Sequence, residues 1–545
     1  MSRHDDAFDV RKDAVKIAHD RNFANNHPDN GEENKYKDQD GNRNFIANFS
    51  KGLKHHEITN RDAGEVINPD YKKLVNALES EKQQDFENLT LGGPPPDFGR
   101  KFTNPQSGLA FDLEGPDSHD LAIRPAPKID SEEAAGEMAE LYWMALCRDV
   151  PFSEFGMNAT VGDAVTDLST NYTDFPHSPF PGQALQITSD TIFRGIGNGV
   201  LTGQYISQFL YKDIKWGAQV LLQKQRIVVT NHDYLQDYQT WLDAQNGKNI
   251  NVSDDFVGTE TDVRYIITPR DLAYWVHVDA LYQAYLGACL ILLGDSNKFD
   301  PLLPYQNSNT QIGFGTFGGP HILSLVTEVA TRALKAVWYQ KWVVHRRLRP
   351  EAFAGLIHRQ KNSTSPAPTP GLTAPSPAYI FSQKLSNSAV LPKIFQHNAA
   401  SIAPGSYLLP QAFPEGSPTH PSYGAGHATV AGACVTILKA WFDEDDLIKN
   451  PQKPTDDGSA LVAARGPQLT VGGELNKVAA NIAIGRNWGG VHYRSDYTES
   501  ILLGEQVAIG ILQEQALTFN EKFACTLTKF NGQKIKFDGT KINVI

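Results

Sequence analysis

The chain has 545 residues, of which 40% are hydrophobic, 21% charged and 10% aromatic, as is ordinary for a globular protein with a large buried core. Its 62 acidic residues outnumber its 50 basic ones and give a net charge of −12, which argues against general nucleic-acid binding. The first thirty residues lack the apolar core of a secretory signal, and no later stretch is apolar over a membrane-spanning length. We therefore expect a soluble, cytoplasmic protein that does not contact membranes.

We predict three parts in chain order. Residues 1–60 are polar and charged and form an N-terminal arm, which becomes ordered only by packing on the body or on a neighbouring subunit. Residues 61–520 form a helical body whose active site lies within residues 341–496. Residues 521–545 form a C-terminal β-hairpin tail, because alternating apolar residues are interrupted there by Asn-Gly and Asp-Gly turn signals.

The body is expected to be mainly α, built from helical bundles with small β elements, because apolar residues recur at helical spacing. Residues 90–129, rich in Pro and Gly, predict a long irregular connection before these helices. Residues 361–377, rich in Pro, Ser and Thr, predict a surface loop, and a solvated connection is favoured over a lid. The predicted helices cover residues 131–146, 270–293, 321–344, 428–441, 474–484 and 497–512.

The cysteines Cys147, Cys289, Cys434 and Cys525 are widely spaced and form no pair of the metal-binding type. Three of them fall in apolar helical patterns, so buried free thiols are expected rather than disulfides or metal ligands.

Two other patterns resemble ligand sites but lack the necessary context. The glycines of 313–318 match G-x-G-x-x-G, yet the sequence before them is polar and no strand is predicted, so a dinucleotide site is not expected. His55 and His56 have no third ligand at useful spacing, so both are expected at the surface.

The first stretch with chemical content is KWVVHRRLRP, in which Lys341, His345 and Arg349 fall at i, i+4 and i+8 on one face of a predicted helix. The proline that follows disfavours the α region for Arg349, which should therefore sit at the helix end with its guanidinium turned inward. Taken alone, the stretch is better explained as a basic helix end with solvated charges, as Arg346 and Arg347 are expected to be.

The second stretch, HPSYGAGH, precedes a predicted helix. Gly424 and Gly426 leave the backbone open, so N–H groups at the helix start can converge on an anion. His427 begins the helix, where it can exchange protons with a bound ligand, and His420 in the preceding loop can line the same cavity. The alternative is an ordinary helix-start turn with incidental histidines.

In the third stretch, GRNWGGVHYRSD, a predicted helix ends at Ile484. Arg486 and His492 are then presented from a Gly-rich loop, which allows close approach of the backbone to a ligand. Asp496, followed three residues later by Glu499, is expected to cap the next helix. Orientation of a nearby imidazole is the less favoured role for Asp496.

Together the three stretches supply what a tetrahedral oxyanion needs. Several fixed cations and backbone amides can hold its charge, and an imidazole can act as its nucleophile or ligand. Phosphate and vanadate both fit this description. The set comprises Lys341, Arg349, Arg486, Gly424, Gly426, His427 and His492.

The three stretches, in this order, resemble the signature of the vanadium-dependent haloperoxidases, which are related to the class A acid phosphatases and lipid phosphate phosphatases. The spacing from Lys341 to Arg349 is similar to that of haloperoxidases rather than of the shorter-spaced phosphatases. The phrases NFIANFSKGLKHH, FGTFGGPHILSLVTEVATRALKAV, HRRLRPEA, THPSY and GELNK resemble the bromoperoxidases of red algae in particular. This similarity extends from about residue 44 to residue 517.

The resemblance implies an enzyme that uses hydrogen peroxide to oxidise bromide or iodide, with chloride left open, to a hypohalous acid that halogenates organic small molecules. It implies vanadate as cofactor, with phosphate able to occupy the site in its absence. His427 would act as general base and acid, and Lys341 would polarise the peroxide. The residues that would hold vanadate are His492 as the metal ligand and Lys341, Arg349, Arg486 and the Gly426 amide around its oxygens.

The halide pocket would be lined by His420, and two nearby positions depart from the family pattern. Ala425 stands where members usually have serine, so a hydroxyl that bonds an equatorial oxygen is missing. One bond to a charged oxygen is worth about 1.5–3 kcal/mol, so vanadate affinity or halide preference should differ. Gln340 replaces an arginine that red algal relatives often have before the motif lysine, which changes the charge on the halide side.

The resemblance also implies a homo-oligomer, with a dodecamer of interlocking subunits favoured over a dimer, and structural Ca²⁺ or Mg²⁺ ions without assignable ligands. Two alternatives stay open. A phosphomonoesterase would use His492 as nucleophile and His427 as leaving-group acid, but the spacing and the extent of the similarity count against it. An inactive phosphate-holding or shell-forming protein is supported by Ala425 alone.

Overall fold

The computed structural model describes residues 2–21, 24, 26–38, 40–93, 99–172, 186–195, 197–249, 255–372 and 381–545. Residues 94–98 of the predicted connection and residues 373–377 of the predicted surface loop lie outside these ranges.

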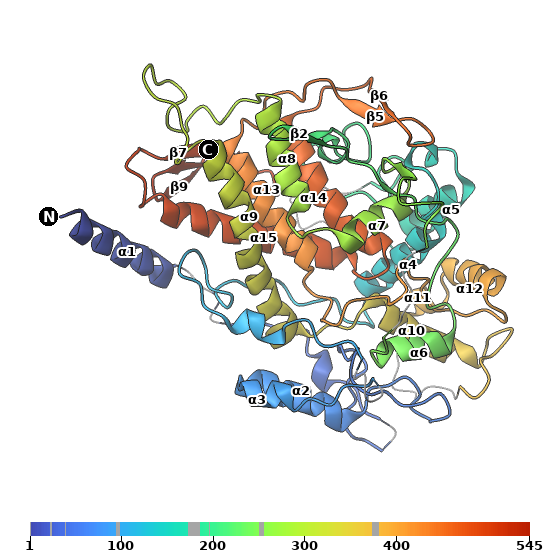
Figure 1. Ribbon diagram of the computed structural model, residues 1–545. Coiled ribbons are helices and arrows are strands. Elements are labelled where there is room, and N and C mark those ends of the chain that lie inside the picture. The colour runs from blue at the N-terminus through green and yellow to red at the C-terminus, as the bar shows by residue number, and fades with distance from the viewer. Residues whose placement is uncertain are drawn as a thin grey trace.

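Loops and shorter helices occupy the first half of the chain, whereas long helices dominate the second half (Figure 1). The first half contains α1 (Arg3–Asp20), α2 (Asn68–Ser80), α3 (Gln83–Glu87), α4 (Glu132–Cys147), α5 (Ala159–Asn171), α6 (Tyr238–Gln245) and α7 (Pro269–Val278). The rest contains α8 (Gln283–Gly294), α9 (Gly319–Trp338), the π-helical segment η5 (Tyr339–His345), α10 (Pro350–Asn362), α11 (Gln383–Ser386), α12 (Val390–Ser401), α13 (Gly426–Trp441), α14 (Val471–Trp488) and α15 (Arg494–Gln515).

In the described residues, the named strands form four small antiparallel sheets. Three of them are two-stranded, and the C-terminal one has three strands because both turn signals of the tail form turns. The tail therefore contains one strand more than the predicted hairpin. The pairs are β1 (Ile214–Trp216) with β2 (Gln219–Leu221), β3 (Gln225–Arg226) with β4 (Val263–Arg264), β5 (Gln452–Pro454) with β6 (Leu461–Ala463), and β7 (Ala524–Thr528) with β8 (Lys534–Asp538) and β9 (Lys541–Val544).

The mainly α prediction is confirmed, and the predicted helices at 131–146, 428–441, 474–484 and 497–512 correspond to α4, α13, α14 and α15. The predicted helix 270–293 is wrong as a single element. It divides into α7 and α8, which meet at an angle of 101°. Apolar periodicity continues across this break, because both helices bury an apolar face. Across the described part of the chain, no single helix is long and apolar enough to cross a membrane.

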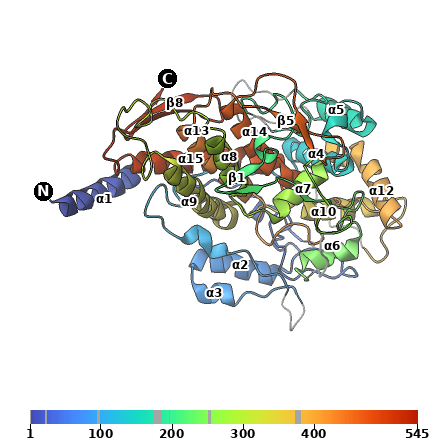
Figure 2. The same ribbon diagram turned by 45° about the horizontal axis from the view of Figure 1, so that its top comes forward.

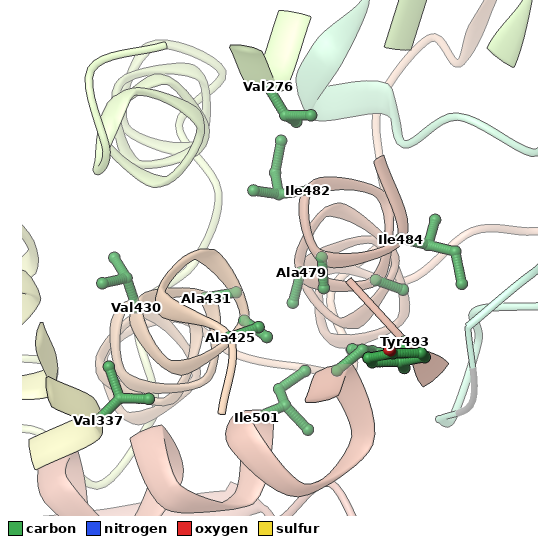
Figure 3. Close-up of a cluster of buried hydrophobic side chains, with 14 of the residues drawn as sticks. Val276, Val337, Ala425, Val430, Ala431, Ala479, Ile482, Ile484, Tyr493 and Ile501 are labelled. Atoms are coloured by element: carbon green, nitrogen blue, oxygen red, sulfur yellow. The ribbon is translucent and has the colours of Figure 1, made fainter. Parts of the chain in front are cut away.

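Helix α13 forms the centre of the body and packs against α9, α14 and α15, which gather in the middle of the molecule in both views (Figure 1, Figure 2). Every residue of α13 except His427 is buried. A helix that is apolar nearly all round must be enclosed by other helices. Figure 3 shows part of this enclosure, with Val337 of α9, Ile482 of α14 and Ile501 of α15 beside α13, and Val276 of α7 next to Ile482. His427 is therefore presented at the end of a rigid element.

The N-terminal arm has two differently packed parts. Helix α1 buries none of its residues and extends outward from the body (Figure 1). Later residues return to the body, where Phe45, Phe49 and Leu53 join the main core. The Phe49 amide donates to the Arg346 carbonyl at 2.7 Å, so this part of the arm packs on the turn after η5.

Two smaller expectations differ in outcome. The expectation of free cysteines is confirmed, since each of the four is buried and unbridged. The surface placement of His55 is wrong, because its side chain is buried and its Nδ1 lies 2.9 Å from the Leu53 carbonyl oxygen. A backbone contact of this kind cannot be read from the spacing of histidines.

Candidate active site

Lys341 lies on η5 and is fully buried. Its ammonium donates to the carbonyl oxygens of Pro421 at 2.8 Å and Ser422 at 3.1 Å, which brings the first and second stretches together. Burial lowers the pKa of Lys341 well below its usual value, and the charges of Arg349 and Arg486 add to this effect.

The prediction that Lys341, His345 and Arg349 share one helix face is wrong. The π-helical segment ends at His345, and Arg346 then adopts a left-handed φ of 41°. Arg349 precedes α10 instead of ending the earlier helix. Its backbone is extended, with φ −80° and ψ 155°, as expected for a residue before proline.

Arg349 connects all three stretches. Its Nε donates to the His420 carbonyl at 2.9 Å, and its Nη2 lies 2.9 Å from His420 Nδ1. Its Nη1 donates to the Val491 carbonyl at 2.7 Å and lies 3.1 Å from His492 Nε2. Burial lowers the pKa of Arg349 to about 9. The convergence that the sequence pattern predicted for these residues is therefore present in the fold.

Arg486 lies in the last turn of α14, so its predicted place in a loop after Ile484 is wrong. Gly485 lies within the helix, and its lack of a side chain lets α7 pack closely against it, since a Cβ there would lie 2.9 Å from a methyl of Val276. Arg486 donates to the Val276 carbonyl at 2.8 Å and faces the Phe413 ring at 5.4 Å. Burial lowers its pKa, and its Nε has no hydrogen-bond partner among the described residues.

His492 lies in the loop between α14 and α15 and is buried. Its Nδ1 lies 2.7 Å from Asp496 Oδ2, whereas its Nε2 faces Arg349. Since a guanidinium only donates and a carboxylate only accepts, Nδ1 carries the proton and Nε2 presents a lone pair. Burial, together with Arg349 and Lys341, lowers the pKa of His492 well below its usual value, so the ring is neutral.

The predicted capping box of Asp496 with Glu499 is wrong, although Asp496 both caps α15 and orients an imidazole. It is the third residue of α15, not the residue before the helix, and it accepts the Tyr493 amide at 3.1 Å. The same carboxylate oxygen also binds His492.

The prediction that Arg347 carries a solvated charge is wrong, because its guanidinium is buried and donates to Asp496 at 2.9 Å. Arg346 is likewise paired, with Glu33 at 2.7 Å.

His427 forms a second imidazole–carboxylate pair, which sequence reasoning missed. Its Nε2 lies 2.9 Å from Oδ1 of Asp279, at the end of α7. The side chain of His427 is 18% exposed, whereas that of Asp279 is 3% exposed. Asp279 stands at the break between α7 and α8, and an acidic residue within the apolar span 270–293 is the signal that could have found it.

The predicted halide-pocket residues separate into two groups. His420 is buried beside Trp338, with ring centroids 4.9 Å apart, and the Lys341 ammonium lies 5.6 Å from the same indole. Burial lowers the pKa of His420 well below its usual value. Trp338 was missed because it reads as the last apolar residue of α9. Gln340 faces away, since its amide donates to the Leu121 carbonyl at 2.8 Å and lies 3.3 Å from His27.

Ala425 is the residue that precedes α13. Its amide donates to the Ser500 hydroxyl at 2.8 Å, and its methyl lies in the apolar cluster of Figure 3. A methyl group cannot accept hydrogen bonds from the helix amides, so the first-turn N–H groups, including that of Gly426, are left for a ligand.

The site contains buried positive charges that no carboxylate balances in the described part of the chain. Lys341, Arg349 and Arg486 are all buried, yet no carboxylate forms an ion pair with any of them among the residues that the structure describes. Buried charge is costly unless it is paired, so this site is built to receive an anion. In the described ranges, no group of three or more His, Cys, Asp or Glu side chains could hold a metal cation.

Comparison with known proteins gives concordant results. A family model described as the VCPO second helical-bundle domain matches residues 401–521. The vanadium-dependent bromoperoxidase of Corallina officinalis is 41% identical over 98% of both chains. That of Ascophyllum nodosum is 34% identical over 92% of this chain and 88% of its own. The homohexameric structure of the second vanadate-dependent bromoperoxidase from Ascophyllum nodosum matches with a TM-score of 0.86 at 28% identity, over 99% of this chain and 92% of that one.

Proposed function

Because the chain belongs to the vanadium-dependent bromoperoxidases, we propose that it binds vanadate and uses hydrogen peroxide to oxidise bromide. The product is hypobromous acid or an equivalent, which halogenates organic small molecules, and iodide is oxidised by the same route. The observation that carries the proposal is the group of three buried cations, Lys341, Arg349 and Arg486, which form no ion pair with a carboxylate in the described part of the chain.

These residues fit vanadate. His492 offers an Nε2 lone pair as the metal ligand, and its Nδ1 is held by Asp496. The three cations and the Gly426 amide would hold the oxygens. Bound vanadate supplies a Lewis acid that polarises peroxide without a change in oxidation state. Phosphate has the same shape and charge and would occupy this site when vanadate is absent.

His427 is proposed to move protons to and from hydrogen peroxide. Asp279 accepts from Nε2, so Nδ1 of His427 carries the lone pair that can take a proton. The partial exposure of this side chain gives the proton a path to solvent. Asp279 also fixes the orientation of the ring through each turnover.

Lys341 is proposed to act on the bound peroxide, and His420 is proposed to line the approach of the halide. Two of the three N–H donors of Lys341 are taken by carbonyl oxygens, so the third is left to polarise the peroxide. His420 and Trp338 form an aromatic wall beside it, where a halide with weak hydration can approach. Gln340 is not included in this wall.

The proposal extends to assembly. A homo-oligomer is supported by the homohexameric relative, and a dodecamer is favoured over a dimer by the likeness to red algal enzymes. Helix α1 exposes the apolar side chains of Phe8 and Val15. The arm of residues 1–60 is therefore suited to contact the body, residues 61–520, of a neighbouring subunit. Structural Ca²⁺ or Mg²⁺ stays a proposal without assigned ligands. Light scattering on the purified protein measures the subunit number.

One experiment tests the proposed activity. The protein is purified without phosphate, vanadate is added or withheld, and peroxide-dependent bromination of a dye is followed beside hydrolysis of a chromogenic phosphate ester. We expect bromination that requires vanadate and exceeds hydrolysis. Bromination without vanadate would show that the proposal is wrong. Hydrolysis that exceeds bromination would also show this, and a phosphomonoesterase would then be the better description.

A further inference from the structure

The Asp496 carboxylate is a junction between the three stretches of the site. It is fully buried and accepts from Arg347 Nη1 at 2.9 Å on one oxygen. Its other oxygen accepts from the Ser422 hydroxyl and from His492 Nδ1 at 2.7 Å. One donor therefore comes from each stretch, so the position of this carboxylate depends on all three.

Arg347 is itself held from several sides. Its Nη2 donates to Glu137 Oε2, on α4, at 2.8 Å, and its Nη1 also donates to the Ser495 hydroxyl at 3.0 Å. Its guanidinium lies 3.8 Å from the centre of the Tyr493 ring. Glu137 in turn accepts the Ser495 amide at 2.6 Å, so the carboxylate behind Arg347 is fixed to the start of α15.

We propose that Arg347 is a positioning residue for the vanadate site: through Asp496 it fixes the ring of His492, with Glu137 as the anchor on the far side. This inference rests on the proposed function, because it assigns His492 as the vanadium ligand. Groups behind a metal ligand set its orientation, and their loss lowers metal affinity about 10- to 100-fold.

The planar fork of arginine is needed for this role. It reaches two carboxylates in different directions at once, whereas a lysine ammonium is a single point that can approach only one of them closely. Burial lowers the pKa of Arg347, but Glu137 and Asp496 outweigh it and raise that pKa above its usual value. The side chain therefore stays charged at any pH at which the enzyme works.

The fold offers a matched control in a second buried arginine–glutamate pair. Arg494, the first residue of α15, pairs with Glu140, which lies one turn after Glu137 on α4. Both side chains of this pair are 2% exposed, close to the 4% and 1% of Arg347 and Glu137. Arg494 also donates to the Arg194 carbonyl at 3.1 Å, and neither Arg194 nor Glu140 belongs to the candidate vanadate site.

The test compares Arg347→Lys with Arg494→Lys. Vanadate binding to the vanadate-free protein is measured by equilibrium dialysis, and stability is measured by the urea midpoint. We expect Arg347→Lys to raise the vanadate Kd about 10- to 100-fold. Arg494→Lys should lower the urea midpoint similarly but change the Kd by less than about twofold. Equal effects of the two variants on Kd would overturn the inference.

A second variant covers the case in which Arg347→Lys does not fold. Ser422→Ala removes one hydroxyl donor to Asp496 without leaving a buried charge, so the urea midpoint should change little. Its vanadate Kd should rise about 3- to 10-fold, the value of a single hydrogen bond. An unchanged Kd would count against the inference. Failure of the wild-type protein to bind vanadate would instead refute the proposed function, so the two failures are distinguishable.

Discussion

Two clusters of buried positive charge lie in the same helical body and differ in what balances them. In the first, Lys341, Arg349 and Arg486 surround the candidate vanadate site and face carbonyls and imidazoles. In the second, Arg148 and Arg270 share carboxylates. We call these the open cluster and the closed cluster. The closed cluster joins Arg148, Arg270, Asp149, Asp233 and His397.

In the closed cluster, the arginines are paired with carboxylates of the same cluster. Arg270 binds Asp149 at 2.6 Å and Asp233 at 3.0 Å, and Arg148 also binds Asp233. Burial would raise the pKa of Asp233, but the two arginines outweigh it and hold that pKa well below its usual range. In the open cluster, burial lowers the pKa of each cation. Burial also lowers the pKa of Arg148 in the closed cluster, so the two clusters differ in their pairing with carboxylates and not in the direction of every cation's pKa. Paired charge indicates a structural role, and unpaired buried charge indicates a ligand site.

The largest effect is expected from the imidazoles of the two clusters. His427 and His397 each contact an aspartate at 2.9 Å, and His427 lies close enough to the open cluster for its charge to lower the pKa of His492. His427→Ala should lower kcat for bromide oxidation about 100- to 10,000-fold, because a proton carrier is lost. His397→Ala is the matched control and should leave kcat within about twofold. Steady-state kinetics of the vanadate-loaded variants would contradict the assignment if both fell equally.

Removal of one cation from each cluster should have opposite effects on stability. Arg148→Met leaves Asp233 short of a partner and should lower the free energy of unfolding by about 3–5 kcal/mol. Arg486→Met removes an unbalanced charge and should leave the vanadate-free protein equally or more stable. Urea unfolding of both variants without vanadate measures this difference. A similar loss in the two variants would erase the distinction between the clusters.

Ala425 offers a way to complete the open cluster. Ala425→Ser adds a hydroxyl at the start of α13, and a bond to a charged oxygen is worth about 1.5–3 kcal/mol. Vanadate affinity should therefore increase about tenfold or more, unless the hydroxyl turns to the helix amides instead. Equilibrium dialysis measures the vanadate affinity, and steady-state kinetics with bromide and with chloride measure the halide preference. If neither affinity nor halide preference changes, the missing serine has no consequence here.

The smallest effect is expected at Gln340. Its amide faces Leu121 and His27, so Gln340→Ala should leave the KM for bromide within about twofold. His420→Ala, on the wall beside Trp338, should raise that KM several-fold. A large change at Gln340 would return it to the halide pocket, where the sequence pattern had put it.

The sequence predicted the candidate site better than its detailed geometry. Local rules were sufficient where one short segment decides the outcome: the proline after Arg349 determines its extended backbone, and the glycines before His427 precede a helix. The meeting of Arg349 with His420 and His492 also follows the predicted association of the three stretches.

The remaining features depend on contacts between distant segments. Gly485 reads as a helix breaker, yet Val276 packs against it and the helix continues through Arg486. Asp279 contacts His427, which lies 148 positions away in the sequence. Arg347 donates a hydrogen bond to Glu137, which lies 210 positions away. No spacing rule joins such residues, because tertiary packing alone brings them together.

The central claim is that the open cluster is an anion site, and calorimetric titration of the vanadate-free protein tests it most directly. Tungstate is a suitable probe, since it is a tetrahedral dianion whose own charge is constant near neutral pH. Titration at about pH 8, in two buffers that differ in ionisation enthalpy, gives both the stoichiometry and the protons exchanged.

We predict one anion per chain with net proton uptake. A bound anion raises the lowered pKa of Lys341, so the complex holds more protons than the free protein and affinity falls as pH rises. Arg486→Met should weaken this binding, whereas Arg148→Met should not. Binding without proton uptake, or binding of equal strength in the Arg486→Met variant, would contradict the account.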